Sequence, residues 1–216
     1  MSVLEETVCE KDLGVFIDPN LNFEEHVNYV LKKTRSLSGL IMRTIHYKTK
    51  DIMVPLFKSI IRPILEYGNV VWNPILRKHI DSIEAIQRHF TRCIIGMKDL
   101  DYNQRLRALG LPSLEYRRVR GDLIEMYKMT HDLYDTVTTK ALLTLDKDSI
   151  TRTNNYKLTK PRVKSKQFQH FFTNRVINTW NKLSDRVVGA GSLNTFKNAV
   201  DDHFRNFMYS TNLNFY

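Results

Sequence analysis

The chain has 216 residues, of which 42% are hydrophobic and 26% charged, so it is long enough to bury a core in one or two domains. Its 33 Lys and Arg residues exceed its 23 Asp and Glu residues and leave a net charge of +10, which favours a polyanionic partner such as nucleic acid. Two cysteines are too few for a disulfide framework, and the sequence shows neither a run of about 18 apolar residues nor a signal-peptide core, so we expect an intracellular, nuclear or cytoplasmic protein outside the membrane.

The first predicted element is a short β-strand. Leu13, Val15 and Ile17 recur at every second position, which is the period of a strand. Asn22, followed three positions later by Glu25, resembles a capping box, in which two side chains satisfy the backbone N–H groups at a helix start. Apolar residues at helical spacing then predict a helix that continues to about residue 47.

The rest of the chain predicts helices in series. One covers about residues 49–67 and contains Pro55 and Pro63, each of which removes a backbone hydrogen bond, so this helix should be kinked or broken. Residues 132–166 are polar and rich in Thr, and we expect a linker, or a loop that orders on binding, with a helical turn only near Leu142. Further helical segments are expected over about residues 81–95, 106–110, 113–130, 167–183 and 192–208.

A cluster of basic residues lies in and just after the predicted linker. Between residues 151 and 170 the chain has six cations and no acid, with Tyr156 and Phe168 among them. Cations that hold phosphates beside aromatic rings that stack on bases are typical of a surface for single-stranded nucleic acid or a hybrid duplex. The alternative is a disordered basic linker without a specific ligand. The six cations are Arg152, Lys157, Lys160, Arg162, Lys164 and Lys166.

Two predicted helices also present basic faces. Successive residues of a helix turn by about 100°, which places Arg117 and Lys128 with Gly121 on the face opposite Val119 and Leu123. A glycine between two cations lets a phosphate backbone approach closely. A solvated polar face without a ligand is the alternative. The candidate nucleic-acid-binding residues of the two helices are Lys32, Lys33, Arg35, Arg117, Arg118, Gly121 and Lys128.

The sequence predicts no catalytic residue, metal or cofactor. Polymerases use paired carboxylates on a hairpin to hold two metal ions, whereas the Asp201-Asp202 pair lies in a helical pattern and is interpreted as solvated surface. His89 and Cys93 have a spacing that can hold zinc on a helix, but two cysteines cannot build a Cys/His knuckle.

Five segments of the sequence carry a resemblance to a known family. They are EKDLGVFID at 10–18, FKSIIRPILEYG at 57–68 with VWNP at 71–74, LGLPSLEYRRVRGDL at 109–123, FFTNRVINTWNKL at 171–183 and SLNTFK at 192–197. In their order and spacing, these segments resemble the C-terminal part of a non-LTR (LINE-type) retrotransposon reverse transcriptase. The segment at 109–123 is the most specific, and the resemblance covers roughly residues 8–205. It departs at Ser184, where the family usually has Pro.

The resemblance implies that the strand around Leu13 and Gly14 closes a polymerase palm and acts as a primer grip, and that a helical thumb follows it. In the family the metal-binding carboxylates precede this strand, so they are expected to be missing here. The predicted segments are a palm-end strand at 1–20, a helical thumb-like domain at 21–131, a basic linker at 132–166 and a helical unit at 167–216.

The predicted fold is therefore mostly α, a thumb-like helical bundle with one short N-terminal strand and a small C-terminal helical unit. The predicted function is salt-sensitive binding of an RNA–DNA template–primer or single-stranded nucleic acid, without catalysis by the chain alone. Two alternatives remain open. In the first alternative, the chain is a subunit that completes a palm carried on another chain. In the second, it is a helical module that binds a protein partner.

Overall fold

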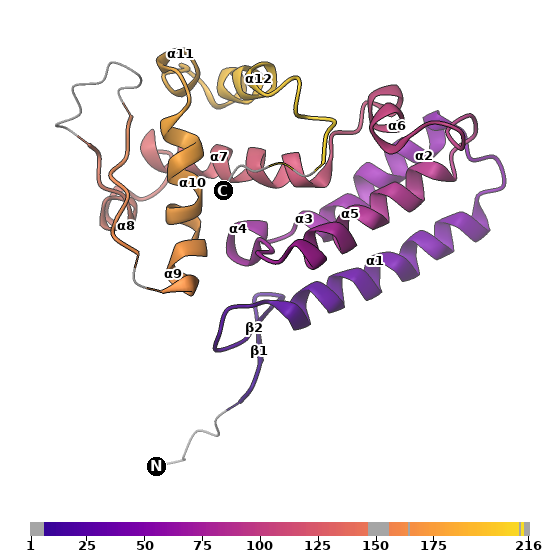
Figure 1. Ribbon diagram of the computed structural model, residues 1–216, viewed down its shortest axis with the longest axis horizontal. Coiled ribbons are helices and arrows are strands. Elements are labelled where there is room, and N and C mark those ends of the chain that lie inside the picture. The colour runs from indigo at the N-terminus through magenta and orange to yellow at the C-terminus, as the bar shows by residue number, and fades with distance from the viewer. Residues whose placement is uncertain (1–6, 147–155, 164, 212, 214–216) are drawn as a thin grey trace. The chain divides into compact units, whose positions relative to one another are not determined.

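The computed structural model describes residues 7–146, 156–163, 165–211 and 213. These residues are mostly helical, with one two-stranded sheet near the N-terminus, which confirms the predicted fold class (Figure 1). The chain divides into two units, Met1–Leu114 and Glu115–Tyr216, so the predicted thumb-like segment 21–131 includes parts of both. Each unit buries aromatic rings of its own, the first around Phe90 and the second around Trp180.

The N-terminal sheet is a hairpin of β1 (Glu10–Asp12) and β2 (Val15–Ile17). Leu13 and Gly14 form its two-residue turn, with φ angles of 44° and 85°. Two positive φ angles define the turn type whose twist matches a hairpin, and glycine adopts such an angle without strain. The prediction of one strand that includes Leu13 is therefore wrong, because β1 pairs with β2 and Leu13 lies between them.

Asp18 connects the hairpin to helix α1 (Glu24–Thr44). One oxygen of its carboxylate accepts hydrogen bonds from Asn20 N and Asn22 N, at 3.0 and 3.2 Å, and the other accepts one from Phe23 N at 2.8 Å. Phe23 is the N-cap and has no side-chain hydrogen bond, so the predicted capping box at Asn22 is wrong. A capping box does form at the start of α6 (Tyr102–Leu109), between Asp101 and Gln104.

Replacing Asp18 by alanine should therefore lower the free energy of unfolding by about 1–2 kcal/mol, because three backbone N–H groups lose their acceptor. The matched change is Asn22→Ala, at the position that the sequence pattern favoured, which should cost less than about 0.5 kcal/mol. Urea unfolding of both variants measures the difference. Equal losses would mean that Asp18 does not organise the start of α1.

The helix expected over 49–67 changes its hydrogen-bond pattern between its two prolines. It consists of α2 (Lys50–Leu56), the π-helix η1 (Phe57–Ile61) and α3 (Arg62–Glu66), with Pro55 inside α2 and Pro63 in the first turn of α3. The predicted break in the α-helix is present in this form. α4 (Asn69–Trp72) follows, after Gly68 at φ 65°.

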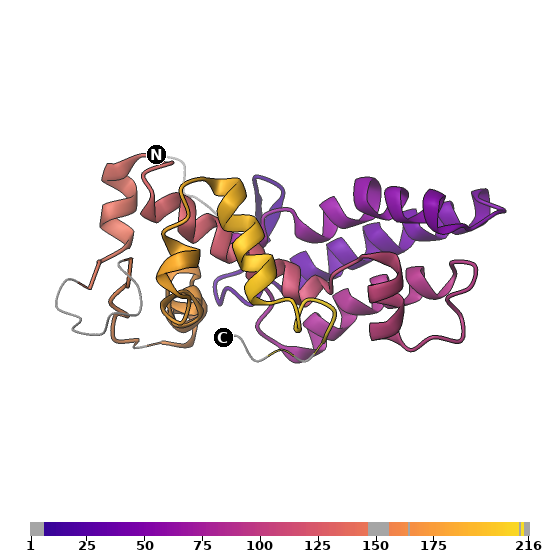
Figure 2. The ribbon, with the colours of Figure 1, turned by 90° about the horizontal axis from the view of Figure 1, so that it is seen from above.

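Helix α5 (Arg77–Arg92) lies beside α1 in the first unit (Figures 1 and 2). On α5, Glu84 is 1% exposed and accepts hydrogen bonds from Tyr102 Oη at 2.5 Å and Leu114 N at 3.2 Å. Gly110 ends α6 with a φ of 60°. The stretch 109–123 that carries the most specific resemblance is therefore the junction at which α6 ends and α7 (Leu114–Thr130) begins.

The second unit is organised around α7, α10 (Phe172–Asn181) and α12 (Leu193–His203). Val119 and Leu123 of α7 are buried, as the helical pattern predicted. Asp122 of α7 is fully buried and forms a two-pronged ion pair with Arg175 of α10, with Nε–Oδ2 and Nη2–Oδ1 distances of 2.9 and 3.0 Å. The predicted helix over 167–183 is interrupted at Phe171, which separates α9 (Lys166–His170) from α10, and α11 (Asp185–Val188) was not predicted.

Tyr156 and Leu158 of the predicted linker are hydrogen-bonded to α10. α8 (Thr136–Leu142) forms near the expected helical turn, and Leu158 pairs with Leu145 in an isolated bridge. The Asn181 side chain accepts from Leu158 N at 2.9 Å and donates to Leu158 O at 2.8 Å, while Trp180 Nε1 donates to Tyr156 O at 2.8 Å. Leu158 is 2% exposed, so this segment is part of the core of the second unit.

Candidate nucleic-acid interface

Helix α1 presents cations that have no acidic neighbours in sequence. Residues 26–50 contain six Lys or Arg residues and no Asp or Glu. The predicted Lys32, Lys33 and Arg35 are exposed on α1, as is Arg43 in its last turn. None of these four forms an ion pair with another residue that the structure describes. The helix therefore concentrates positive charge on its exposed side.

A hollow of about 310 Å³ lies beside the hairpin turn. It brings together Gly14 and Lys33, which the sequence analysis placed in two separate sites. Leu13 is 83% exposed at the same turn. The hollow combines two lysines with two tyrosine rings, and its lining residues are Lys11, Gly14, His26, Tyr29, Val30, Lys33, Pro63, Ile64 and Tyr67.

Two hydrogen bonds hold the hairpin against the helices. Tyr67 Oη donates to Leu13 O at 2.9 Å, and Phe16 N donates to His26 Nδ1 at 3.3 Å. The His26 ring also packs edge-on against Trp72, with 4.7 Å between the ring centres. Because these contacts fix both the turn and β2, they determine where Lys11, the one cation of the hairpin, lies.

His26 is neutral in this position. It is 2% exposed, and burial together with the nearby positive charge of Lys11 lowers its pKa to about 4. Because Nδ1 accepts the hydrogen bond from Phe16 N, the ring proton must be on Nε2. Lys11 itself lies over two rings, with Nζ 4.9 Å from the centre of Tyr29 and 5.3 Å from that of Phe16.

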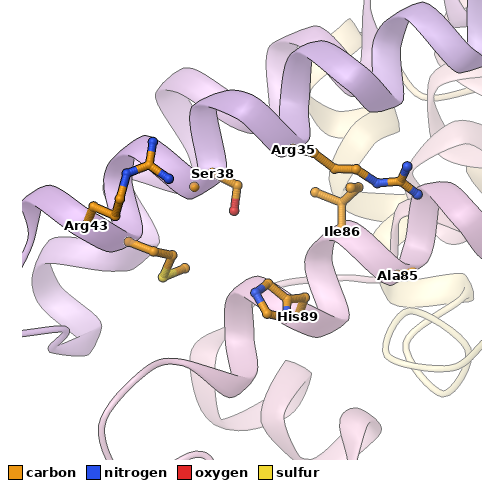
Figure 3. Close-up of a pocket in the computed structure, with 8 residues that line it drawn as sticks. Arg35, Ser38, Arg43, Ala85, Ile86 and His89 are labelled. Carbon is orange, nitrogen blue, oxygen red and sulfur yellow. The ribbon is translucent and has the colours of Figure 1, made fainter.

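A second hollow, of about 470 Å³, lies between α1 and α5 (Figure 3). Arg35 and Arg43 lie at its two ends and His89 faces them from α5. Lys33 therefore lines the hollow beside the hairpin and Arg35 lines the hollow toward α5, whereas Lys32 lines neither.

The predicted face of α7 is less open than the sequence suggested. Arg118 is 3% exposed and cannot present its guanidinium to a nucleic acid, so its inclusion among the binding residues is wrong. Arg117 and Gly121 are half-buried. Lys128 Nζ lies 2.7 Å from Glu125 Oε1, and this hydrogen bond raises its pKa. An acid thus already neutralises Lys128, which the helical pattern alone could not show.

The basic linker is described only in part. Lys160 and Arg162 are exposed, while Lys157 is half-buried and its carbonyl accepts a hydrogen bond from Asp146 N. Tyr156, expected to stack on a base, instead stacks on His131 with 4.3 Å between the ring centres. Arg152, Lys164 and the side chain of Lys166 lie outside the described residues.

The two neighbouring aspartates of α12 have different surroundings. Asp201 accepts hydrogen bonds from Tyr116 Oη at 2.7 Å and from Arg120 Nε and Nη2 at 2.6 and 2.9 Å. The side chain of Asp201 is 32% exposed, so the predicted solvated surface is only partly present there, and two residues already bind the carboxylate. Asp202 is exposed and pairs with Arg205, which agrees with the prediction.

In the ranges that the structure describes, no group of three or more His, Cys, Asp or Glu side chains is placed to share a metal ion. Cys93 is half-buried at the C-cap of α5, and His89 lines the hollow between α1 and α5. In the same ranges, no helix is both long and apolar enough to cross a membrane.

Several residues of this surface were missed from the sequence. Arg43 belongs to the same acid-free run as Lys32, and extending the charge count from 32–35 to the whole of 26–50 would have found it. Lys11 and Tyr67 carry no comparable signal, because 56 residues separate them and only the fold brings them to one hollow.

No family model matches the chain, and no solved structure matches it. The chain is 24% identical over 111 residues to an uncharacterized protein of Caenorhabditis elegans, which covers 50% of the chain and 56% of that protein. It is also 29% identical over 89 residues to a probable RNA-directed DNA polymerase from transposon X-element of Drosophila melanogaster. These aligned residues are 40% of the chain and 10% of the polymerase. The chain thus spans about half the length of one relative and a tenth of the length of the other.

Proposed function

We propose that this chain is a fragment derived from a reverse transcriptase and that it binds nucleic acid through the phosphate backbone, as an RNA–DNA hybrid or a single strand. The observation that carries the proposal is the exposed face of α1, where Lys32, Lys33 and Arg35 have no described acidic partner. Contacts to phosphates position a strand but carry no sequence information. Binding should therefore be salt-sensitive and independent of sequence.

The hairpin hollow supports the same function. Lys11 and Lys33 there lie beside the rings of Tyr29 and Tyr67, which is the combination of phosphate-binding cations and stacking surfaces found in single-strand binding proteins. The similarity to a probable RNA-directed DNA polymerase also supports nucleic acid as the class of ligand.

The proposed function does not include catalysis by the chain alone. A two-metal polymerase needs neighbouring carboxylates that are available to metal ions. Asp201 is instead engaged by Arg120 and Tyr116, and Asp202 by Arg205, on a helix. We therefore expect the purified chain, given primed RNA, deoxynucleotides and Mg²⁺, to bind the primed RNA without extending the primer.

Salt dependence of binding tests the proposal. Each single-strand phosphate contact contributes about 0.7 to the slope of log K against log salt concentration. Replacing Lys32, Lys33 and Arg35 together by Gln should therefore reduce that slope by about 2. Fluorescence anisotropy of a labelled single-stranded oligonucleotide, titrated at several salt concentrations, measures it.

The matched control removes three exposed cations that already have acidic partners. These are Arg77, paired with Asp81 at 2.8 Å, Lys78, paired with Glu24 at 2.8 Å, and Arg205, paired with Asp202. Their replacement by Gln should leave the slope nearly unchanged, although the net charge falls equally. The same slope in both triple variants would place binding elsewhere, and an affinity of the unmodified chain that is flat with salt would favour a protein partner.

A further inference from the structure

The hollow between α1 and α5 has the size of a ligand site. Its volume of about 470 Å³ is within the range of roughly 300–1,000 Å³ that is usual for small-molecule pockets. It lies entirely within the first unit. α1 contributes Arg35, Ser38, Gly39, Met42 and Arg43, and α5 contributes Ala85, Ile86 and His89.

The interior of the hollow is apolar and is open because of a glycine. Met42 and Ile86 provide apolar surface, and Ala85 is small. A Cβ added at Gly39 would meet only the Nη1 atom of Arg43, at 3.3 Å, so the space beside Gly39 is otherwise empty. A flat, apolar group can enter here, and the thioether of Met42 is well suited to contact an aromatic ring.

The rim is cationic at both ends. Arg35 and Arg43 are eight residues apart on α1, or about 12 Å along the helix axis, and both are exposed (Figure 3). Neither has an ion-pair partner among the described residues. A guanidinium group binds phosphate oxygens with two parallel hydrogen bonds, and its plane can also stack on a base.

We propose that this hollow holds one unstacked base of a single-stranded nucleic acid, with the neighbouring phosphates on Arg35 and Arg43. The inference rests on the proposed function and names the part of the strand that this site takes. A helical peptide fits less well, because such a ligand needs a row of anchors over two turns, whereas α5 lines the hollow only from Ala85 to His89, about 6 Å.

Filling the hollow without changing charge tests this inference. Gly39→Leu places a side chain in the space that the base would occupy, and at its Cβ only the flexible end of Arg43 must move. Thr44→Leu adds the same side chain at an exposed position of α1 that does not line the hollow. Circular dichroism and thermal unfolding establish that both variants are folded.

Affinity is measured for two strands of equal length, a short adenine oligonucleotide and one in which abasic sugars replace every nucleoside. Stacking of one base contributes enough binding free energy that its loss in Gly39→Leu should weaken binding of the adenine strand about tenfold. Its affinity for the abasic strand should be nearly unchanged, because both arginines remain and only the flexible end of Arg43 shifts. Thr44→Leu should match the unmodified chain with both strands.

Each other outcome has a separate meaning. If Gly39→Leu binds both strands as the unmodified chain does, no base enters the hollow and the inference fails, while salt-sensitive binding still supports the proposed function. If the unmodified chain binds neither strand, the proposed function fails as well. If Gly39→Leu abolishes binding of an acidic amphipathic peptide and spares both oligonucleotides, the hollow is a protein-binding site and the inference is overturned.

Discussion

Replacing Asp122 by alanine is expected to lower the free energy of unfolding of the second unit by about 3–5 kcal/mol. Asp122 is fully buried and Arg175 is 6% exposed, and their two hydrogen bonds of 2.9 and 3.0 Å hold α7 to α10. Without the carboxylate, a buried guanidinium loses its counter-charge, and the loss of solvation is no longer compensated. Domains ordinarily have a free energy of unfolding of about 5–15 kcal/mol, so such a loss removes a large share of it.

Two further variants separate this effect from a general loss of charge. Asp202→Ala removes the carboxylate of an exposed ion pair with Arg205 and should cost less than about 1 kcal/mol. The double change Asp122→Leu with Arg175→Met replaces both charges by apolar groups and should cost far less than Asp122→Ala alone. Denaturant unfolding followed by far-UV circular dichroism compares them. A cost for Asp122→Ala no greater than that for Asp202→Ala would contradict the importance of the buried pair.

The contact between the hairpin and α1 is expected to weaken as the pH falls from 6.5 toward 4. The pKa of His26 is about 4 in the folded chain, below its ordinary value of 6.5, so the unfolded chain takes up the proton more readily. The contribution of His26 is therefore complete above pH 6.5 and is lost as the pH falls through this window, by at most about 3 kcal/mol. Protonation also replaces the acceptor of Phe16 N by a donor and sets a second charge near Lys11.

His26→Asn is the variant that tests this effect, because asparagine retains an acceptor but does not titrate in this range. Burial also lowers the pKa values of His79, His131 and His170, so the difference between the unmodified chain and His26→Asn isolates one histidine. Unfolding free energies at pH 7 and pH 4.5 should differ less in the variant. The exposed His46, changed to Asn, serves as the control. An identical loss in all three proteins would rule out His26 as the sensitive group.

Features that depend on neighbours in sequence were predictable. The helical period placed Val119 and Leu123 in the core of the second unit, and the lack of an N–H group at Pro55 and Pro63 predicted an interruption of the α-helix. The count of cations also pointed to Lys32, which is exposed on α1.

Features that depend on contacts between distant residues were not predictable. Asp122 and Arg175 are 53 positions apart, and nothing in either local pattern indicates a buried charge. Lys128 has the spacing of an exposed cation, yet Glu125 and Tyr134 bind it. At the N-terminus, the alternation of apolar residues predicted a strand through Leu13. Leu13 and the neighbouring Gly14 instead form the two-residue turn of a hairpin.

The π-helix η1 also determines how the chain can accommodate changes in its length. A π-helix closes hydrogen bonds between residues i and i+5, one position more than an α-helix, so it contains the equivalent of one inserted residue. Met53 before η1 and Leu65 after it are both buried, so the extra residue is absorbed between them. Homologous chains that lack one residue between Pro55 and Pro63 are therefore expected to form a continuous α-helix there and to retain the same core.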